Sequence, residues 1–167
     1  EHGAGMMRLL LSAGADPNTQ DVFNRRTALM LAAEHGGEHG AEMMRALLAE
    51  GAAVDKQDHG GSTALMLATR CGWSHAAGMM RVLLSAGADP NKQNEDGDTA
   101  LMIAAWHGDE HGAEMMRVLL TARADTNKQA KTGMTALMQA ARDGGKHGGG
   151  VMKVLLDAGA DPNKQSK

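Results

Sequence analysis

Apolar positions along the chain gather in pairs of short clusters that follow a polar segment. In residues 94–129, NEDGDT precedes the cluster ALMIAAWH, and a second cluster containing MM and VLL follows. Within each cluster the apolar spacing places side chains on one face of an α-helix. Those side chains are Leu101, Met102, Ala104 and Ala105 in the first cluster, and Met115, Met116, Leu119 and Leu120 in the second. The pattern predicts two amphipathic helices, the second starting near Ala113.

Polar residues around these clusters predict where the helices begin and end. NEDGD has the composition of a turn, and Gly97 can adopt the positive φ that a tight turn requires. Thr99 stands where a helix N-cap belongs, and Gly108 follows the first cluster as a C-terminal stop. The local signals therefore predict a turn followed by an antiparallel helix pair.

This unit recurs along the chain at a fixed spacing. TALM begins at residues 27, 63, 99 and 135, so each copy follows the previous one by 36 residues. Each unit also carries an apolar doublet such as Met43–Met44 and an ending such as ADPNKQ at 88–93. Self-similarity on this scale is typical of a stacked array in which each unit contacts only its neighbours.

The unit resembles the ankyrin repeat. The family pattern D-x-x-G-x-T-P-L-H-x-A-A-x-x-G, an apolar pair, LL and G-A-D-x-N is similar to NEDGDTALMIAAWHG, MM, VLL and ARADTN in 94–129. The resemblance implies an all-α fold, an ankyrin-repeat solenoid of stacked antiparallel helix pairs with projecting β-turn loops. Residues 1–167 then form a single array, with a partial repeat at 1–20 and repeats at 21–57, 58–93, 94–129 and 130–165.

The units depart from the family pattern in systematic ways. Ala replaces the family's Pro in TALM, Met replaces its His, and three extra residues separate the helices. Because Met lacks the hydrogen bonds of the imidazole and can only pack, we expect the turns to be held by Asp and Asn side chains at 89, 91, 125 and 127. The turn DVFNRR has one extra residue, which places Asn24 or Arg25 at the position equivalent to Gly97. Asn24 is favoured, because Asn tolerates left-handed φ.

Two columns of aligned polar residues have structural interpretations. We predict that Gln20, Gln57, Gln93, Gln129 and Gln165 hydrogen-bond between turns, because they recur at the end of every unit. The basic column comprises Arg8, Arg45, Arg81, Arg117 and Lys153. This column is interpreted as a solvated face, partly paired with Glu42 and Glu114 three residues before the arginines of their own helices.

Composition and charge narrow the classes of function. The 167 residues include only 2% aromatic residues but 14 Met, so the core must consist of Leu, Ala and Met. A net charge of −3 gives no field that would attract nucleic acid, and no apolar run approaches the roughly 18 residues needed for membrane insertion. The single Cys71 excludes an internal disulfide framework and fits a reducing compartment, so we expect an intracellular, cytoplasmic protein.

Catalytic and metal-binding chemistry find little support in the motifs. The chain has no G-x-S-x-G motif, no Walker loop and no plausible Cys–His pair, which indicates a non-enzymatic protein without cofactors. Four aligned pairs of residues, four positions apart, have side chains that can bind a metal: His35 and His39, Cys71 and His75, His107 and His111, Asp143 and His147. Because a Gly follows the first member and zinc needs three or four protein ligands, we favour no metal. The second members are predicted to cap helices or bind turn carbonyls, and the first members to face a partner.

The resemblance implies that the chain binds another protein through turn tips and the concave face of the first helices. The corresponding positions are Val22, Phe23, Arg25, Arg26, Glu34, His35, His59, Ser62, Arg70, Cys71, Glu95, Asp98, Trp106, His107, Lys131, Met134, Arg142 and Asp143. Phe23 and Trp106 are predicted to contribute most, because exposed aromatic residues dominate interface energies.

A structural role is the alternative function. EHGAGMMRLLL supplies only a second helix, so the array has an uncapped flank. We expect the sequence to belong to a longer array or this flank to be covered, and self-association through uncapped ends would make the chain a subunit of a larger complex or filament.

Overall fold

The computed structural model describes residues 2–71, 74–107, 110–143 and 148–166. Its helices are α1 (His2–Ser12), α2 (Ala28–His35), α3 (Gly40–Ala49), α4 (Ala64–Cys71), α5 (Ala76–Ser85), α6 (Ala100–Trp106), α7 (Glu110–Thr121), α8 (Ala136–Asp143) and α9 (Gly148–Asp157), with the short 3₁₀ helix η1 (Gly37–His39) before α3. The described residues contain no strand, and the all-α prediction is confirmed.

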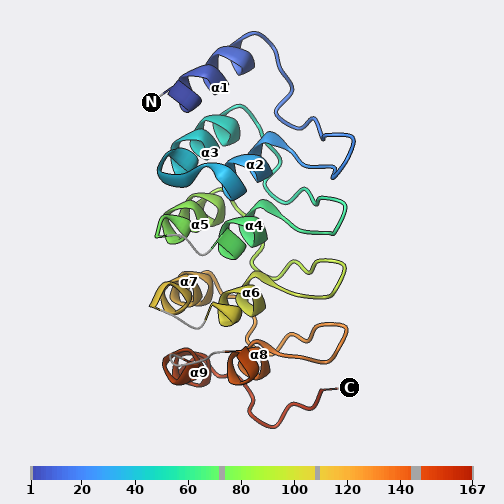
Figure 1. Ribbon diagram of the computed structural model, residues 1–167, viewed down its shortest axis with the longest axis vertical. Helices are drawn as coiled ribbons and strands as arrows, with labels where there is room; N and C mark the ends of the chain where they lie inside the picture. Colours follow the sequence, from blue (N-terminus) through green and yellow to red (C-terminus); the bar gives the residue numbers. More distant parts are fainter. Residues whose placement is uncertain (1, 72–73, 108–109, 144–147, 167) are drawn as a thin grey trace.

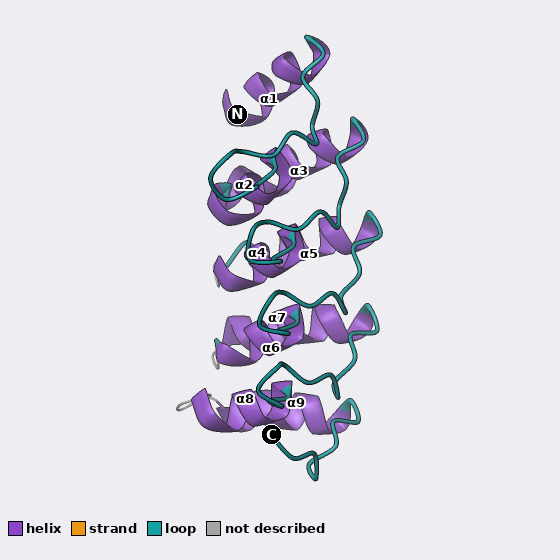
Figure 2. Cartoon of the chain, turned by 90° about the vertical axis from the view of Figure 1, so that its right-hand side faces the viewer, coloured by secondary structure: helices purple, strands orange, loops and turns teal. Residues whose placement is uncertain are grey.

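The helices stack in two parallel rows. The first helices of the units, α2, α4, α6 and α8, form one row, and the second helices, α1, α3, α5, α7 and α9, form the other (Figure 1). The loops project from the side of the first helices, and Figure 2 shows them arranged one above the other. This arrangement gives each unit its own turn on one continuous surface.

Threonine side chains begin the first helices, as the TALM motif predicts. The Thr27 hydroxyl accepts the Met30 N–H at 3.3 Å, and the same contact recurs at Thr63, Thr99 and Thr135. The Thr27 N–H also donates to Met30 Sδ at 3.4 Å, which completes a capping box. The expectation that the methionines replacing His only pack is therefore wrong for Met30, because its thioether is a weak acceptor.

Leucine, alanine and methionine form the core, as expected from composition. Met44, Met80 and Met116, which belong to successive doublets, are completely buried, and so are Leu47, Leu83, Leu119 and Leu155. The equivalent residue of α1, Leu10, is 54% exposed, because among the described residues α1 packs mainly against α3, whereas the other second helices pack against a first helix as well. The same sequence position is therefore core in four units and surface in one.

The glutamine column forms the predicted ladder between turns. The Nε2 groups of Gln20, Gln57, Gln93 and Gln129 donate to the carbonyls of Gln57, Gln93, Gln129 and Gln165, at 2.9–3.0 Å. Each amide also donates to a carbonyl in its own turn, such as that of Gly97 at 2.6 Å from Gln93. One side chain thus fixes the shape of a turn and its position on the next.

The expected Asp and Asn contacts form a second ladder. Asp89 Oδ1 accepts the Asn91 N–H at 2.8 Å, and Asn91 reaches the next unit through the Asp125 N–H at 2.7 Å and the Arg123 carbonyl at 3.3 Å. Asp125 and Asn127 repeat the pattern. The prediction that these side chains hold the turns is confirmed.

The prediction for the longer first turn is wrong at one residue. Arg25, not Asn24, has the positive φ, at 56°. The His59 N–H donates to the Asn24 carbonyl at 2.8 Å, and in the next turns Glu95 donates in the same way to Gly60. This bond aligns Asn24 with Gly60, so the extra residue lies before Asn24 and Arg25 occupies the place of Gly61.

The second helix of the 94–129 unit begins earlier than predicted. α7 begins at Glu110, three residues before the predicted start, so His111 lies in a helical turn and not in a loop. His39 and His75 occupy N-cap positions without a capping hydrogen bond from their side chains, so their predicted capping role is wrong. Gly36 follows α2 as predicted, whereas Gly72, Gly108, Gly144 and His147 lie outside the described residues.

Candidate functional site

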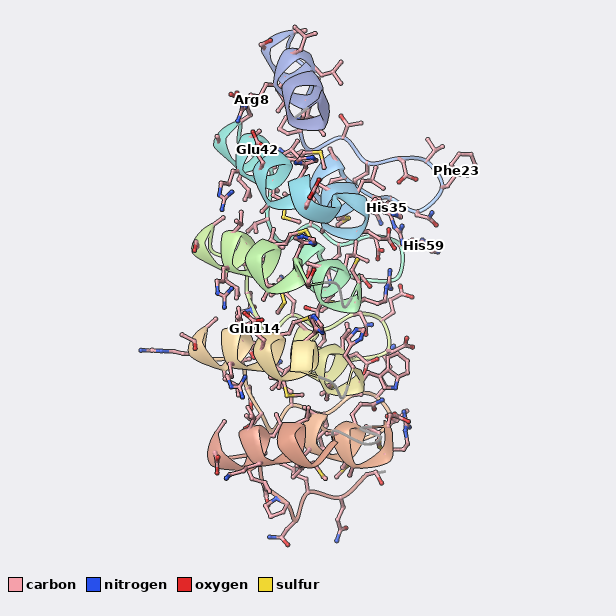
Figure 3. All side chains as sticks on the ribbon, turned by 60° about the vertical axis from the view of Figure 1, so that its left-hand side comes forward. Arg8, Phe23, His35, Glu42, His59 and Glu114 are labelled. Atoms are coloured by element: carbon pink, nitrogen blue, oxygen red, sulfur yellow. The ribbon has the colours of Figure 1, made fainter. Side chains whose placement is uncertain are left out.

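The predicted binding residues lie on the turns and on the exposed side of the first helices. Val22, Phe23, Arg25, His35, His59, Arg70, Glu95, Trp106, Lys131, Arg142 and Asp143 are exposed, and Arg26, Glu34, Cys71, Asp98, His107 and Met134 are half-buried. Ser62 is only 7% exposed, so it offers little area for contact. Figure 3 shows Phe23 projecting from the tip of its turn, on the same side of the molecule as His35 and His59.

A polar network at α2 and α4 uses several of these residues internally. The Glu34 carboxylate, 18% exposed, contacts Arg26 Nη1 and lies 3.1 Å from Arg70 Nη2 and 3.3 Å from His35 Nε2. Asp58 Oδ2 lies 3.7 Å from Arg26 Nε, which is buried without a hydrogen bond. Because these charges already compensate one another, this part of the surface is close to neutral.

Cys71 belongs to the same part of the surface. Its Sγ donates to the carbonyls of Glu34, at 3.1 Å, and Ala33, at 3.5 Å. Burial, followed by the charge of Glu34, raises the pKa of the Cys71 thiol. The thiol is therefore protonated at neutral pH, and its contacts connect α4 to the end of α2.

A pocket of about 300 Å³ lies between α6 and α8, beneath their turns. The structure brings together five of the predicted residues in its lining: Asp98, Trp106, Lys131, Met134 and Arg142. The lining also contains residues that the sequence reasoning missed, namely Asp96, Met102, Ile103, Ala130, Thr132 and Gln139. Ile103 and Gln139 lie three residues before Trp106 and Arg142, and this helical spacing was the signal that could have revealed them.

The indole of Trp106 is fixed at the edge of this pocket. Its Nε1 donates to Asp143 Oδ2 at 2.9 Å, although 57% of the residue is exposed. The same oxygen accepts from Gln139 Nε2 at 2.8 Å and from Arg142 Nε at 2.9 Å. Because Asp143 is thus held from α8, the hydrogen bond orients an exposed aromatic ring of α6 before any partner binds.

Asp98 gives the pocket a carboxylate without a direct side-chain partner. Burial raises the pKa of Asp98, the neighbouring charge of Asp96 raises it further, and Arg142 acts in the opposite direction. Among the described residues, no side chain donates a hydrogen bond or forms an ion pair with this carboxylate. Asp98 is therefore partly removed from water without a direct ion pair, and only the more distant charge of Arg142 favours its ionised form.

The histidine pairs do not form the helical metal-ligand geometry. His107 is the C-cap of α6 and His111 lies in α7, so the two side chains are not on one face of a single helix. Within residues 2–71, 74–107, 110–143 and 148–166, no three His, Cys, Asp or Glu side chains are grouped as metal ligands. In the same part of the chain, no helix has the length and apolar character needed to cross a bilayer.

A stack of helix pairs with one continuous row of turns defines a repeat protein that presents an extended surface. A family model described as ankyrin repeats (3 copies) matches residues 1–94 and 73–166, so the chain belongs to the ankyrin-repeat family. Ankyrin repeats generally mediate interactions between proteins, and proteins built from them are typically non-catalytic scaffolds. No curated protein matches the chain.

Proposed function

We propose that this chain is a non-catalytic scaffold that binds a partner protein through its turn tips and the exposed face of its first helices. The binding residues are those predicted from the sequence, and the pocket between α6 and α8 is the main anchoring point of the surface. The observation that carries the proposal is the Trp106 indole, which is 57% exposed yet held in place by Asp143.

Binding energy in protein interfaces comes mainly from a few aromatic and arginine side chains at well-packed positions. Trp106 stands beside Met134 and Ile103, which give the pocket an apolar wall, and Arg142 lies at its edge. Because the Asp143 contact already orients the indole, binding loses less side-chain entropy there than at a freely rotating residue. Phe23, 87% exposed on a turn tip, extends the same surface.

The aligned positions of the first helices also support a binding role. The residues equivalent to Trp106 are Glu34, Arg70 and Arg142, whereas the buried threonine and leucine positions are identical in each complete unit. Packing therefore does not dictate the residue at this position. The single Cys71, in a chain without the cysteines for a disulfide, supports a cytoplasmic location as part of the proposal.

The test compares wild-type protein with a Phe23→Ala, Trp106→Ala double variant. Partners are isolated from the source cell with the wild-type chain as bait, identified by mass spectrometry, and measured by calorimetry. We expect the double variant to weaken binding about tenfold or more, which corresponds to about 1.4 kcal/mol or more. The thermal midpoint should stay nearly unchanged, because both rings are exposed.

Leu156→Ala provides the matched control, because it also truncates an exposed apolar side chain, but on α9. This variant should bind like the wild type. A double variant that loses stability and affinity together would show that the two rings act as core residues, and unchanged affinity would refute the proposed surface.

Self-association is a second candidate, favoured by the exposed leucines of α1. Leu9 and Leu10 are 68% and 54% exposed, and the residues equivalent to Leu10 are completely buried in the other units. A second copy that packed on α1 would remove these side chains from water. Sedimentation at several concentrations tests this candidate, and a constant monomer mass would eliminate it.

A further inference from the structure

We propose that the pocket between α6 and α8 accepts an arginine side chain from a segment of the partner, with the guanidinium placed between the Trp106 indole and the Asp98 carboxylate. This inference rests on the proposed function, because it assigns a partner chemistry to the main anchoring point of the same surface. It follows from the aromatic wall, the charge balance of the lining and the unpaired carboxylate.

The apolar part of the pocket suits the long stem and planar head of arginine. Trp106, Ile103 and Met134 contribute to the lining, and the methylene groups of an arginine can pack against such residues. A guanidinium stacks on an aromatic face through cation–π attraction, and this attraction is strongest with tryptophan. The fixed indole therefore offers a ready site for a flat cation.

The charges around the pocket favour a cation over an anion. Arg142 and Asp143 pair with each other at 2.9 Å, so their charges compensate one another. The lining that remains contains the carboxylates of Asp96 and Asp98 and the ammonium of Lys131. Lys131 is exposed and forms no ion pair among the described residues. In and beside the pocket, three carboxylates, Asp96, Asp98 and Asp143, therefore stand against two cations, Lys131 and Arg142.

The charge and partial burial of Asp98 determine which class of side chain can bind in the pocket. An acidic side chain would be repelled by Asp96 and Asp98. An apolar side chain would bury the Asp98 carboxylate further without a partner, which is costly. A cation would form the direct ion pair that Asp98 lacks. Arginine fits better than lysine because its guanidinium is planar, more weakly hydrated and able to donate two parallel hydrogen bonds to one carboxylate.

The experiment uses the full chain and a phage-displayed library of random heptapeptides. Peptides that bind the wild-type protein are sequenced, synthesised and measured by calorimetry. Each selected arginine is then replaced by citrulline, which has nearly the same shape but no charge. We expect one position to be enriched in arginine, and its replacement by citrulline to weaken binding to the wild type about tenfold or more.

Two protein variants locate that arginine. On Asp98→Asn, the difference between the arginine and citrulline peptides should fall to about twofold or less, as expected when one partner of a coupled pair is removed. On Asp157→Asn the full difference should persist, because this control removes the same charge from an exposed residue of α9. Circular dichroism checks that both variants fold, and the citrulline comparison on the wild type does not depend on them.

The outcomes separate this inference from the proposed function. Peptides that lose affinity on Trp106→Ala but bind equally well with citrulline would overturn the arginine assignment and leave the proposed surface intact. A selection whose peptides all ignore Trp106→Ala, or one that yields no binder, would count against the proposed surface itself. A citrulline effect that persists on Asp98→Asn would place the arginine elsewhere and refute the inference.

Discussion

The side-chain amide of Gln93 donates two hydrogen bonds, and its truncation should destabilise the array measurably. Its Nε2 donates to the Gly97 carbonyl at 2.6 Å and to the Gln129 carbonyl at 3.0 Å. The first bond closes the 94–98 turn, and the second fixes the position of the following turn. Gln93→Ala removes both of these bonds and leaves two carbonyls without this donor, and it also removes the longer contact of 3.5 Å from Lys128 Nζ to Gln93 Oε1.

The expected magnitude follows from the number and environment of these bonds. A typical intramolecular hydrogen bond contributes about 0.5–1.5 kcal/mol net, so the loss of two predicts a decrease in unfolding free energy of about 1–3 kcal/mol. Gln93 is half-buried, so water replaces part of the lost donation. We therefore expect a value in the lower half of this range.

Urea unfolding at 25 °C, followed by circular dichroism at 222 nm, measures the effect. Gln165→Ala is the matched control, because Gln165 belongs to the same column and accepts through its backbone, while its exposed side chain makes no hydrogen bond among the described residues. The control should unfold like the wild type. Equal effects of Gln93→Ala and Gln165→Ala would refute the idea that the amide ladder stabilises the stack.

Two further predictions concern backbone strain and pH. Arg123 and Gly87 occupy equivalent positions and both have positive φ, 64° and 89°, and the space around Gly87 is open. Arg123→Gly should therefore raise the unfolding free energy by up to about 1 kcal/mol, and Gly87→Ala should lower it by about 1–2 kcal/mol. Urea unfolding measures both effects. The pKa of Asp21 lies below its ordinary value of 3.8, mainly because its carboxylate accepts the backbone N–H of Asn24. The ionised Asp21 carboxylate therefore stabilises the fold above pH 3.8, and this contribution is lost as the pH falls through the folded pKa. Asp21→Asn should therefore reduce the thermal midpoint at pH 7 and have a shrinking effect below about pH 4.

Recurring residues allowed detailed predictions from the sequence. The glutamine column, the threonine caps and the Asp–Asn contacts all repeat with the 36-residue period, and their predicted roles are confirmed. A residue that recurs in every unit meets the same neighbours each time, so one physical interpretation serves the whole array. The exception in the first turn, Arg25 in place of Asn24, arose because a bond from the neighbouring turn fixes the position of the extra residue.

The ion pairs of the second helices show where sequence reasoning was insufficient. The sequence suggested pairing of Glu42 and Glu114 with arginines in their own helices. Instead, Arg8 pairs with Glu42 at 3.3 Å and Arg81 pairs with Glu114 at 3.0 Å, both across neighbouring helices, and Figure 3 shows Arg8 pointing toward Glu42. Adjacent second helices pack side by side, so long side chains can reach between units as well as along a helix.

The repeating unit, its caps, its core and the side on which variable residues lie could be predicted from the chain's periodicity, because periodic spacing reports contacts that every unit makes alike. Which variable residues contact one another became apparent only in the folded array. Trp106 and Asp143 are 37 residues apart, yet their side chains are joined by a hydrogen bond of 2.9 Å, and Asp98 lines the pocket beside them. These contacts depend on how α6 is positioned against α8. Because the residues involved do not recur in the other units, the 36-residue period does not predict them.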